Sequence, residues 1–142
     1  MKQILEKKIE TVVRELQKTG ELPQFVLPEI KVERPKDERF GEYTTNVALV
    51  VAKLAKKNPM EMAQAIESGI TNHESREGDK TFEKIEVVTP GYVNFFLAQK
   101  ELTGVVEKIL KDGKEYGTSM MGQGIKVNNE FISANPTGPL TV

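Results

Sequence analysis

Apolar residues recur every three or four positions in four segments of the chain, which predicts four amphipathic helices. Gly20 follows the first segment and Asp112-Gly113 follows the last, and glycine at these places is typical of helix ends. Asn58-Pro59 begins the third, because asparagine is a good N-cap and proline suits the first helical position. The apolar positions are Leu5, Ile9, Val12, Val13 and Leu16, then Val47, Val50, Val51 and Leu54, then Met62, Ala65, Ile66 and Ile70, and finally Leu102, Val105, Val106, Ile109 and Leu110.

Between these helices the pattern changes to that of strands and loops. FEKIEVVT and GYVNFFLA flank Pro90-Gly91 and predict an antiparallel hairpin. ELPQFVLPEIKVERP holds three prolines and predicts a loop with a short strand over residues 30–33. The polar stretch TNHESREGDK predicts another loop, over residues 71–80. The order of elements indicates an α+β fold, with about four helices and a short antiparallel sheet.

Alternation along GYVNFFLA separates two faces of a strand. Val93, Phe95 and Leu97 form an apolar face that belongs in a core. Tyr92, Asn94 and Phe96 lie on the other face. An aromatic ring with an amide two residues on can stack on a nucleic-acid base and bond its edge, or it can be a half-buried sheet face with a satisfied asparagine. The pattern leaves both interpretations open.

Three other groups of residues each have a structural and a functional interpretation. Phe40 and Tyr43 in FGEYTTNVAL favour a hydrophobic staple and a cap before the second helix, rather than surface recognition. The lysines over residues 53–57 are typical of a charged helix end, although they can also contact phosphates. His73, the only histidine, is expected to be a solvated residue of the polar loop.

The last thirty residues differ from the rest in composition. Residues 113–124 hold four glycines and predict a linker. A buried strand is expected over residues 127–134, and Pro136, Gly138 and Pro139 then break the chain. Glu130, Ser133 and Asn135 surround this strand-to-turn transition. They can hold a cationic group, an amine or a carboxylate, or they can be a solvated strand residue and a turn cap.

Composition limits the classes of function. The 142 residues carry a net charge of −1, so any nucleic-acid contact must be local. Cysteine is absent, which excludes disulfides and thiolate metal sites and fits a reducing cytoplasm. The N-terminal stretch does not have the pattern of a signal peptide, and no segment is apolar enough to span a membrane. We therefore expect a cytoplasmic protein without a metal site.

Three stretches together resemble the arginyl-tRNA synthetases, which are class I enzymes. EFISANPTGPL is similar to the family's E-F-x-S-x-N-P-T-G-P-L, which leads into H-x-G-H. FGEYTTNVAL is similar to F-G-D-Y-x-x-N-x-A-L, and VVTPGYVNFFL to a strand pair ending in G-F-[IV]-N-F-F-L. Their order matches the family's N-terminal additional domain, so the resemblance covers nearly the whole chain.

The resemblance implies an enzyme that attaches arginine to tRNA(Arg) through arginyl-adenylate, with ATP and Mg²⁺. Glu130, Ser133 and Asn135 match arginine-binding positions, and Thr89, Tyr92 and Asn94 match positions that meet the tRNA D-loop. The lead-in to the ATP signature matches Pro136, Thr137, Gly138, Pro139 and Leu140.

The resemblance also implies a division of the chain. Residues 1–112 would be a tRNA D-loop recognition domain, 113–124 a linker, and 125–142 the start of a nucleotide-binding (Rossmann-type) catalytic domain truncated after its first strand. Such a piece is expected to be a monomer and inactive alone. Thr141 stands where the family has the first histidine of its signature. The alternative is a free-standing paralogue that binds tRNA or a protein without catalysis, against which the apolar strand argues.

Overall fold

A computed structural model describes residues 1–78, 80–120, 122 and 124–130. The helices are α1 (Lys2–Lys18), α2 (Val47–Ala55), α3 (Pro59–Glu77) and α4 (Gln99–Asp112), with short 3-10 turns η1 (Glu38–Phe40) and η2 (Gly113–Glu115). The strands are β1 (Val32–Glu33), β2 (Tyr43–Thr45), β3 (Phe82–Val88) and β4 (Tyr92–Leu97). The predicted α+β class, with four helices and an antiparallel sheet, is confirmed.

The strands form one antiparallel sheet in the order β1-β2-β4-β3. The predicted hairpin is present, since β3 pairs with β4 and Val88 lies opposite Tyr92. The strand expected over residues 30–33 is present as the shorter β1. β4 is a central strand between β2 and β3. The side of the sheet on which its apolar residues lie is therefore the side that is buried.

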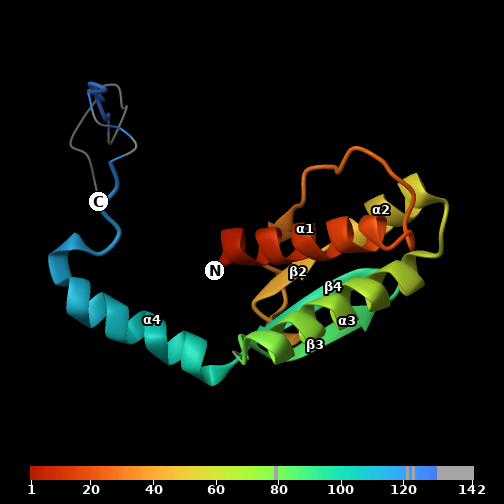
Figure 1. The fold of residues 1–142 in the computed structure, drawn as a ribbon. Helices are drawn as coiled ribbons and strands as arrows, with labels where there is room; N and C mark the ends of the chain where they lie inside the picture. Colours follow the sequence, from red (N-terminus) through yellow and green to blue (C-terminus); the bar gives the residue numbers. More distant parts are fainter. Residues whose placement is uncertain (79, 121, 123, 131–142) are drawn as a thin grey trace, which may run out of the picture.

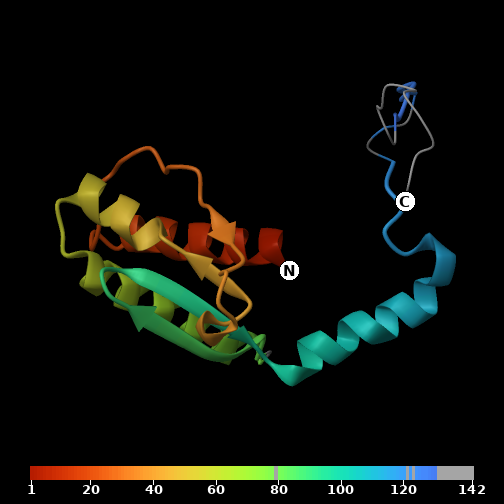
Figure 2. The ribbon, with the colours of Figure 1, turned by 180° about the vertical axis from the view of Figure 1, so that it is seen from behind.

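Helices α1 and α3 cover one face of the sheet and leave the other face open (Figures 1 and 2). Val93 and Phe95 of β4 are completely buried, as their alternation predicts, and β4 packs against α3 and α2. The Phe82 and Phe95 rings pack with their centroids 5.2 Å apart. The helical stripes of α1 and α3 supply most of the remaining core, with Leu5, Ile9, Val12, Val13, Met62, Ala63, Ile66 and Ile70 all buried.

The second helix differs from its predicted packing. Its buried face is Val47, Ala48, Val51 and Ala52, whereas Val50 and Leu54 are exposed. Small residues face inward because α2 packs against both α3 and β4. The two threonines before this helix form β2, a strand that the sequence pattern did not predict. The Thr45 hydroxyl accepts a hydrogen bond from the Val47 N–H (3.3 Å), whereas the Asn46 side chain makes no capping bond.

The predicted loop over residues 71–80 is wrong for its first seven residues. α3 continues to Glu77, and Gly78 ends it with a positive φ of 69°. Glu74 follows Ile66 and Ile70 on the buried stripe and is only 8% exposed; its carboxylate accepts from the Thr81 N–H (3.1 Å). His73 is thus a helix residue, and its Nε2 lies 2.8 Å from the Glu15 carboxylate of α1. In this last part of α3, where the apolar pattern stops, His73 and Glu74 make polar contacts with residues outside the helix.

The fourth helix begins and ends as predicted but adds nothing to the core. α4 projects away from the sheet (Figure 1), and none of its residues is buried. Its apolar side chains are exposed, from 39% at Leu102 to 77% at Leu110. The strand expected over residues 127–134 is not present in residues 127–130, where Val127 is 71% exposed, and residues 131–134 lie outside the described residues. Among the described residues nothing pairs with this segment, and an unpaired strand is not stable alone.

The close approach of α1 and α3 generates a stability prediction. A Cβ added at Gly69 would lie well inside van der Waals contact of the Val12 side chain, which is itself buried. Because both backbones are held by helices, we expect Gly69→Ala to lower the free energy of unfolding by about 1–3 kcal/mol, as overpacking does. Urea unfolding followed by circular dichroism measures this.

Gly104 in α4 provides the matched control, because a Cβ there meets nothing within 4 Å. Gly104→Ala should leave stability unchanged or raise it by up to about 1 kcal/mol, since alanine favours helix. Equal stability of the two variants would contradict the proposed α1–α3 contact.

Candidate functional site

The open face of the sheet carries a small hollow, here called the sheet-face pocket. Its volume is about 270 Å³, below the usual range for drug-sized ligands and suited to one small planar group. It is lined by Pro35, Phe40, Thr44, Val88, Thr89, Tyr92 and Asn94. These residues come from four places in the chain, namely the segment from Pro35 through η1, then β2, β3 with its turn, and β4. The fold thus brings together FGEYTTNVAL and GYVNFFLA, the two stretches that the sequence singled out.

Tyr92 and Asn94 face this pocket because they occupy the outward positions of β4. Tyr92 is 39% exposed, so part of its ring is available to a ligand. Asn94 is 3% exposed and lies at the base of the hollow. The asparagine is buried and bonded, as the structural interpretation expects, while the aromatic ring beside it stays accessible.

A cross-strand hydrogen bond fixes the Asn94 side chain. Thr44 lies opposite Asn94 in the pairing of β2 with β4, and its hydroxyl donates to the Asn94 Oδ1 at 2.7 Å. The Asn94 oxygen thus already accepts a hydrogen bond within the sheet. The amide's other hydrogen-bonding groups are its two N–H donors. A ligand edge that presents an acceptor is therefore the one that Asn94 is prepared to bond.

Phe40 forms a second aromatic wall that the sequence analysis did not assign to a site. It is 42% exposed, whereas its neighbour in the motif, Tyr43, is 8% exposed and belongs to the core. Phe40 ends η1, whose N-cap is Asp37; the Asp37 carboxylate accepts from the Arg39 N–H at 3.0 Å. Bonds from the Arg39 side chain, and then from its backbone, hold the pKa of Asp37 below its usual value, so this cap keeps its charge to a lower pH than a free aspartate.

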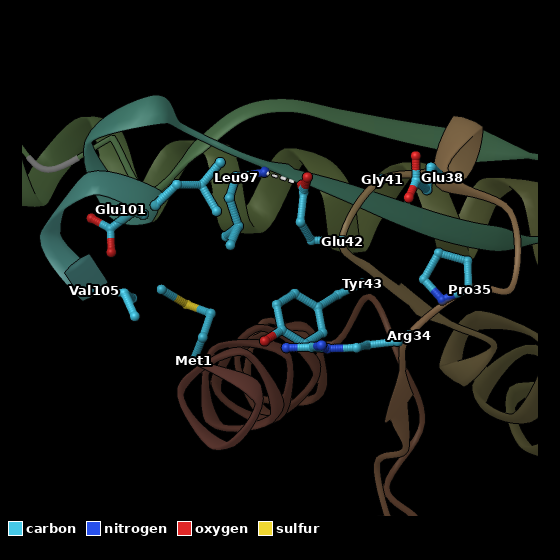
Figure 3. Close-up of a pocket in the computed structure, with 11 residues that line it drawn as sticks. Met1, Arg34, Pro35, Glu38, Gly41, Glu42, Tyr43, Leu97, Glu101 and Val105 are labelled. Carbon is cyan, nitrogen blue, oxygen red and sulfur yellow. Dashed lines mark hydrogen bonds between the residues drawn. The ribbon is translucent and has the colours of Figure 1, made fainter. Parts of the chain in front are cut away.

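A larger cleft of about 730 Å³ lies between the start of α4 and the sheet. Figure 3 shows Glu101 and Val105 of α4 on one side and Arg34 and Pro35 on the other. The Glu42 carboxylate accepts from the Leu97 N–H at 2.8 Å, drawn as a dashed line. Glu38, Glu42 and Glu101 line this cleft against one arginine, so it disfavours an anionic ligand. For such a ligand the sheet-face pocket is the better candidate.

The residues predicted from the sequence separate into two groups. Thr89, Tyr92 and Asn94 lie together in the sheet-face pocket. Glu130 is exposed and outside any helix or strand. Ser133, Asn135 and the turn of Pro136, Thr137, Gly138, Pro139 and Leu140 lie outside the described residues.

The described residues narrow the chemistry further. They contain no cluster of three or more histidine, aspartate or glutamate side chains that would hold a metal ion. None of the helices in the part of the chain that the structure describes is long and apolar enough to cross a bilayer. The sheet-face pocket offers two aromatic walls, an amide and hydroxyls, and no general base beside a nucleophile.

Comparison with known proteins gives consistent matches. The sequence profile described as "Arginyl tRNA synthetase N terminal domain" matches residues 2–97, the segment from α1 to the end of β4. An arginine–tRNA ligase of Legionella pneumophila is 41% identical over 142 residues, which is all of this chain and 23% of that protein. One of Thermotoga maritima is 46% identical over 114 residues, 80% of this chain and 20% of that protein. The chain thus spans about a quarter of the length of these relatives.

Solved structures show the same fold. The arginyl-tRNA synthetase of Plasmodium falciparum aligns with a TM-score of 0.59 and 17% identity, over 76% of this chain and 18% of that one. That of Thermus thermophilus aligns with a TM-score of 0.52 and 23% identity, over 74% and 15%.

The Thr44–Asn94 bond generates the second prediction. Thr44→Val keeps the shape of the side chain but leaves the buried Asn94 carbonyl without its donor. We expect a loss of about 1–3 kcal/mol in the free energy of unfolding, the usual effect of an unsatisfied buried group. Thr44→Ser, which retains the hydroxyl, should lie close to the parent in urea unfolding. A valine variant as stable as the parent would show that this bond contributes nothing.

Proposed function

Because this chain belongs to the arginyl-tRNA synthetase family, we propose that it is the N-terminal part of an arginine–tRNA ligase, which joins arginine to tRNA(Arg). Its own contribution is recognition of the tRNA. The observation that carries this proposal is the sheet-face pocket, in which an exposed tyrosine lies beside a fixed asparagine amide. The occupant that we propose is one unpaired base of the tRNA D-loop.

An unpaired base suits this pocket for three reasons. Bases in loops can leave the stack and offer a face to an aromatic ring, here Tyr92 with Phe40 as the second wall. The base edge can accept from the Asn94 N–H groups, which Thr44 leaves available. The lining is mostly apolar and the whole chain has a net charge of −1, so stacking rather than a general positive field provides the affinity.

The remaining roles follow from the motif rather than from the pocket. We propose that Glu130, Ser133 and Asn135 bind substrate arginine, and that Pro136, Thr137, Gly138, Pro139 and Leu140 lead into the ATP site of the complete enzyme, which uses Mg²⁺ with ATP. Residues 1–112 would then be the tRNA-recognition domain, 113–124 the linker and 125–142 the first part of the catalytic domain. A monomer acting in the cytoplasm completes the proposal.

Tyr92→Ala tests the pocket. Since stacking is worth about 1–3 kcal/mol per base, the substitution should weaken tRNA binding roughly tenfold or more. Asn94→Ala should cost less affinity and more discrimination at the bound base, because a hydrogen bond reads identity whereas stacking largely does not. Steady-state kinetics of the full-length enzyme, with tRNA changed at single D-loop positions, measures both effects.

Tyr116 gives a matched control, because it is 44% exposed but follows α4, away from the pocket. Tyr116→Ala should leave tRNA binding and base preference unchanged. If Tyr92→Ala folds normally and also leaves both unchanged, the open sheet face is structural and recognition lies elsewhere.

The catalytic part of the proposal has a separate test. The 142-residue chain covers 23% of the length of a Legionella relative, so most of the groups that would surround arginine and ATP are contributed by other residues. Because catalysis needs groups held within about half an ångström by supporting neighbours, we expect no arginine-dependent pyrophosphate exchange from this chain, even with tRNA added. The full-length enzyme is the positive control. Turnover by the 142-residue chain above a blank would overturn this assignment.

A further inference from the structure

The lysines at the end of α2 lie beside the turn that forms one edge of the sheet-face pocket. In both ribbon views the turn between β3 and β4 is next to the connection between α2 and α3 (Figures 1 and 2). A Cβ built on Gly91 in this turn would be 3.2 Å from the Leu49 Cδ2 and 3.0 Å from the Pro59 Cβ. The helix end and the pocket edge are therefore packed together.

Helix geometry then places Lys53 on this side of α2. Residues four apart lie on the same face of a helix, and Lys53 follows Leu49 by four. Lys56 follows α2 directly, with a positive φ of 54°. Both side chains are exposed, and neither makes a salt bridge among the described residues. Lys57, in contrast, is held by the Glu21 carbonyl oxygen.

On the other sides of the pocket, most charges are acidic or are paired with a charge of opposite sign. Glu86 lies opposite Asn94 on β3 and pairs with Lys84 (2.8 Å). Asp37 pairs with Arg39 in η1 (2.6 Å), and Glu38 follows it. Near the α2 end, Glu61 in the first turn of α3 is the acidic residue that offsets part of the lysine charge. An anionic chain that leaves the pocket over residues 89–91 thus meets two unpaired lysines, whereas Arg34 and Lys36, which flank Pro35 and are also unpaired among the described residues, lie next to Glu33, Asp37 and Glu38 in the chain.

We propose that Lys53 and Lys56 form a phosphate-binding subsite for the RNA strand whose base occupies the sheet-face pocket. The strand leaves the pocket over the β3–β4 turn, and its next phosphates lie against the end of α2. This inference rests on the proposed function, because it needs a base in the pocket. It specifies the direction in which the RNA strand leaves the pocket. It also assigns a local positive charge to a protein chain whose net charge is −1.

A charged helix end without any ligand is the competing explanation, since lysines near a helix C-terminus also stabilise the helix dipole. The two explanations differ in salt dependence. Each phosphate contact to single-stranded nucleic acid contributes about 0.7 to the slope of log K against log salt concentration. A dipole role would change the unfolding midpoint and leave that slope unchanged.

The experiment measures binding of tRNA(Arg) to the 142-residue chain between about 50 and 200 mM salt. The double variant Lys53→Gln with Lys56→Gln should bind with a slope shallower by about 1.4. The control, Lys7→Gln with Lys108→Gln, removes the same charge from exposed positions on α1 and α4 and should keep the parent slope. Thermal unfolding of each variant is recorded in parallel.

The outcomes separate this inference from the proposed function. A parent-like slope in the Lys53/Lys56 variant, while Tyr92→Ala still weakens binding, overturns the phosphate subsite and leaves the base pocket standing. An equal loss of slope in the control variant also overturns it, because the effect would then be one of net charge. If neither Tyr92→Ala nor the lysine variant changes binding, the pocket and the subsite are both wrong.

Discussion

The burial of one face of β4 is the constraint on which the rest of the structure depends. Val93 and Phe95 are completely buried where β4 packs against α2 and α3, and side chains of a strand alternate between its faces. Tyr92 and Asn94 must therefore point to the open side. A shift of one residue in this strand would exchange the core with the binding face, so the stability of the core also maintains the register of the proposed site.

The neighbours of β4 convert that outward face into a pocket. β2 brings Thr44 opposite Asn94 and fixes the amide, and the segment before β2 places Phe40 over the same area. On the other side, the β3–β4 turn is held against Leu49 and Pro59 at the α2–α3 connection. One rigid framework therefore presents two aromatic walls, an amide and, at its edge, the lysines after α2.

The fourth helix, unlike the other three, has no buried residues. Its apolar stripe is regular, yet the part of the chain that the structure describes buries none of its residues. The family profile ends at residue 97, where the packed core also ends. A helix whose stripe is exposed contributes little to the stability of the sheet and its two covering helices, because the hydrophobic effect follows the apolar area removed from water.

The α+β class, the presence of four helices, the hairpin and the two faces of β4 could be predicted from the sequence alone, because each depends on local periodicity or on turn residues. The sequence motifs also predicted the family, and the alternation predicted that Tyr92 and Asn94 lie on the same face of the strand. The continuation of α3 through His73 and Glu74 depends on tertiary contacts, since their partners are Glu15 on α1 and Thr81 just before β3. The same is true of β2 and of Phe40 as a pocket wall, because a strand of three residues and a contact across four segments leave no periodic signal. The local sequence pattern shows which side of a helix or strand is apolar, whereas tertiary packing decides whether that side is buried against another element.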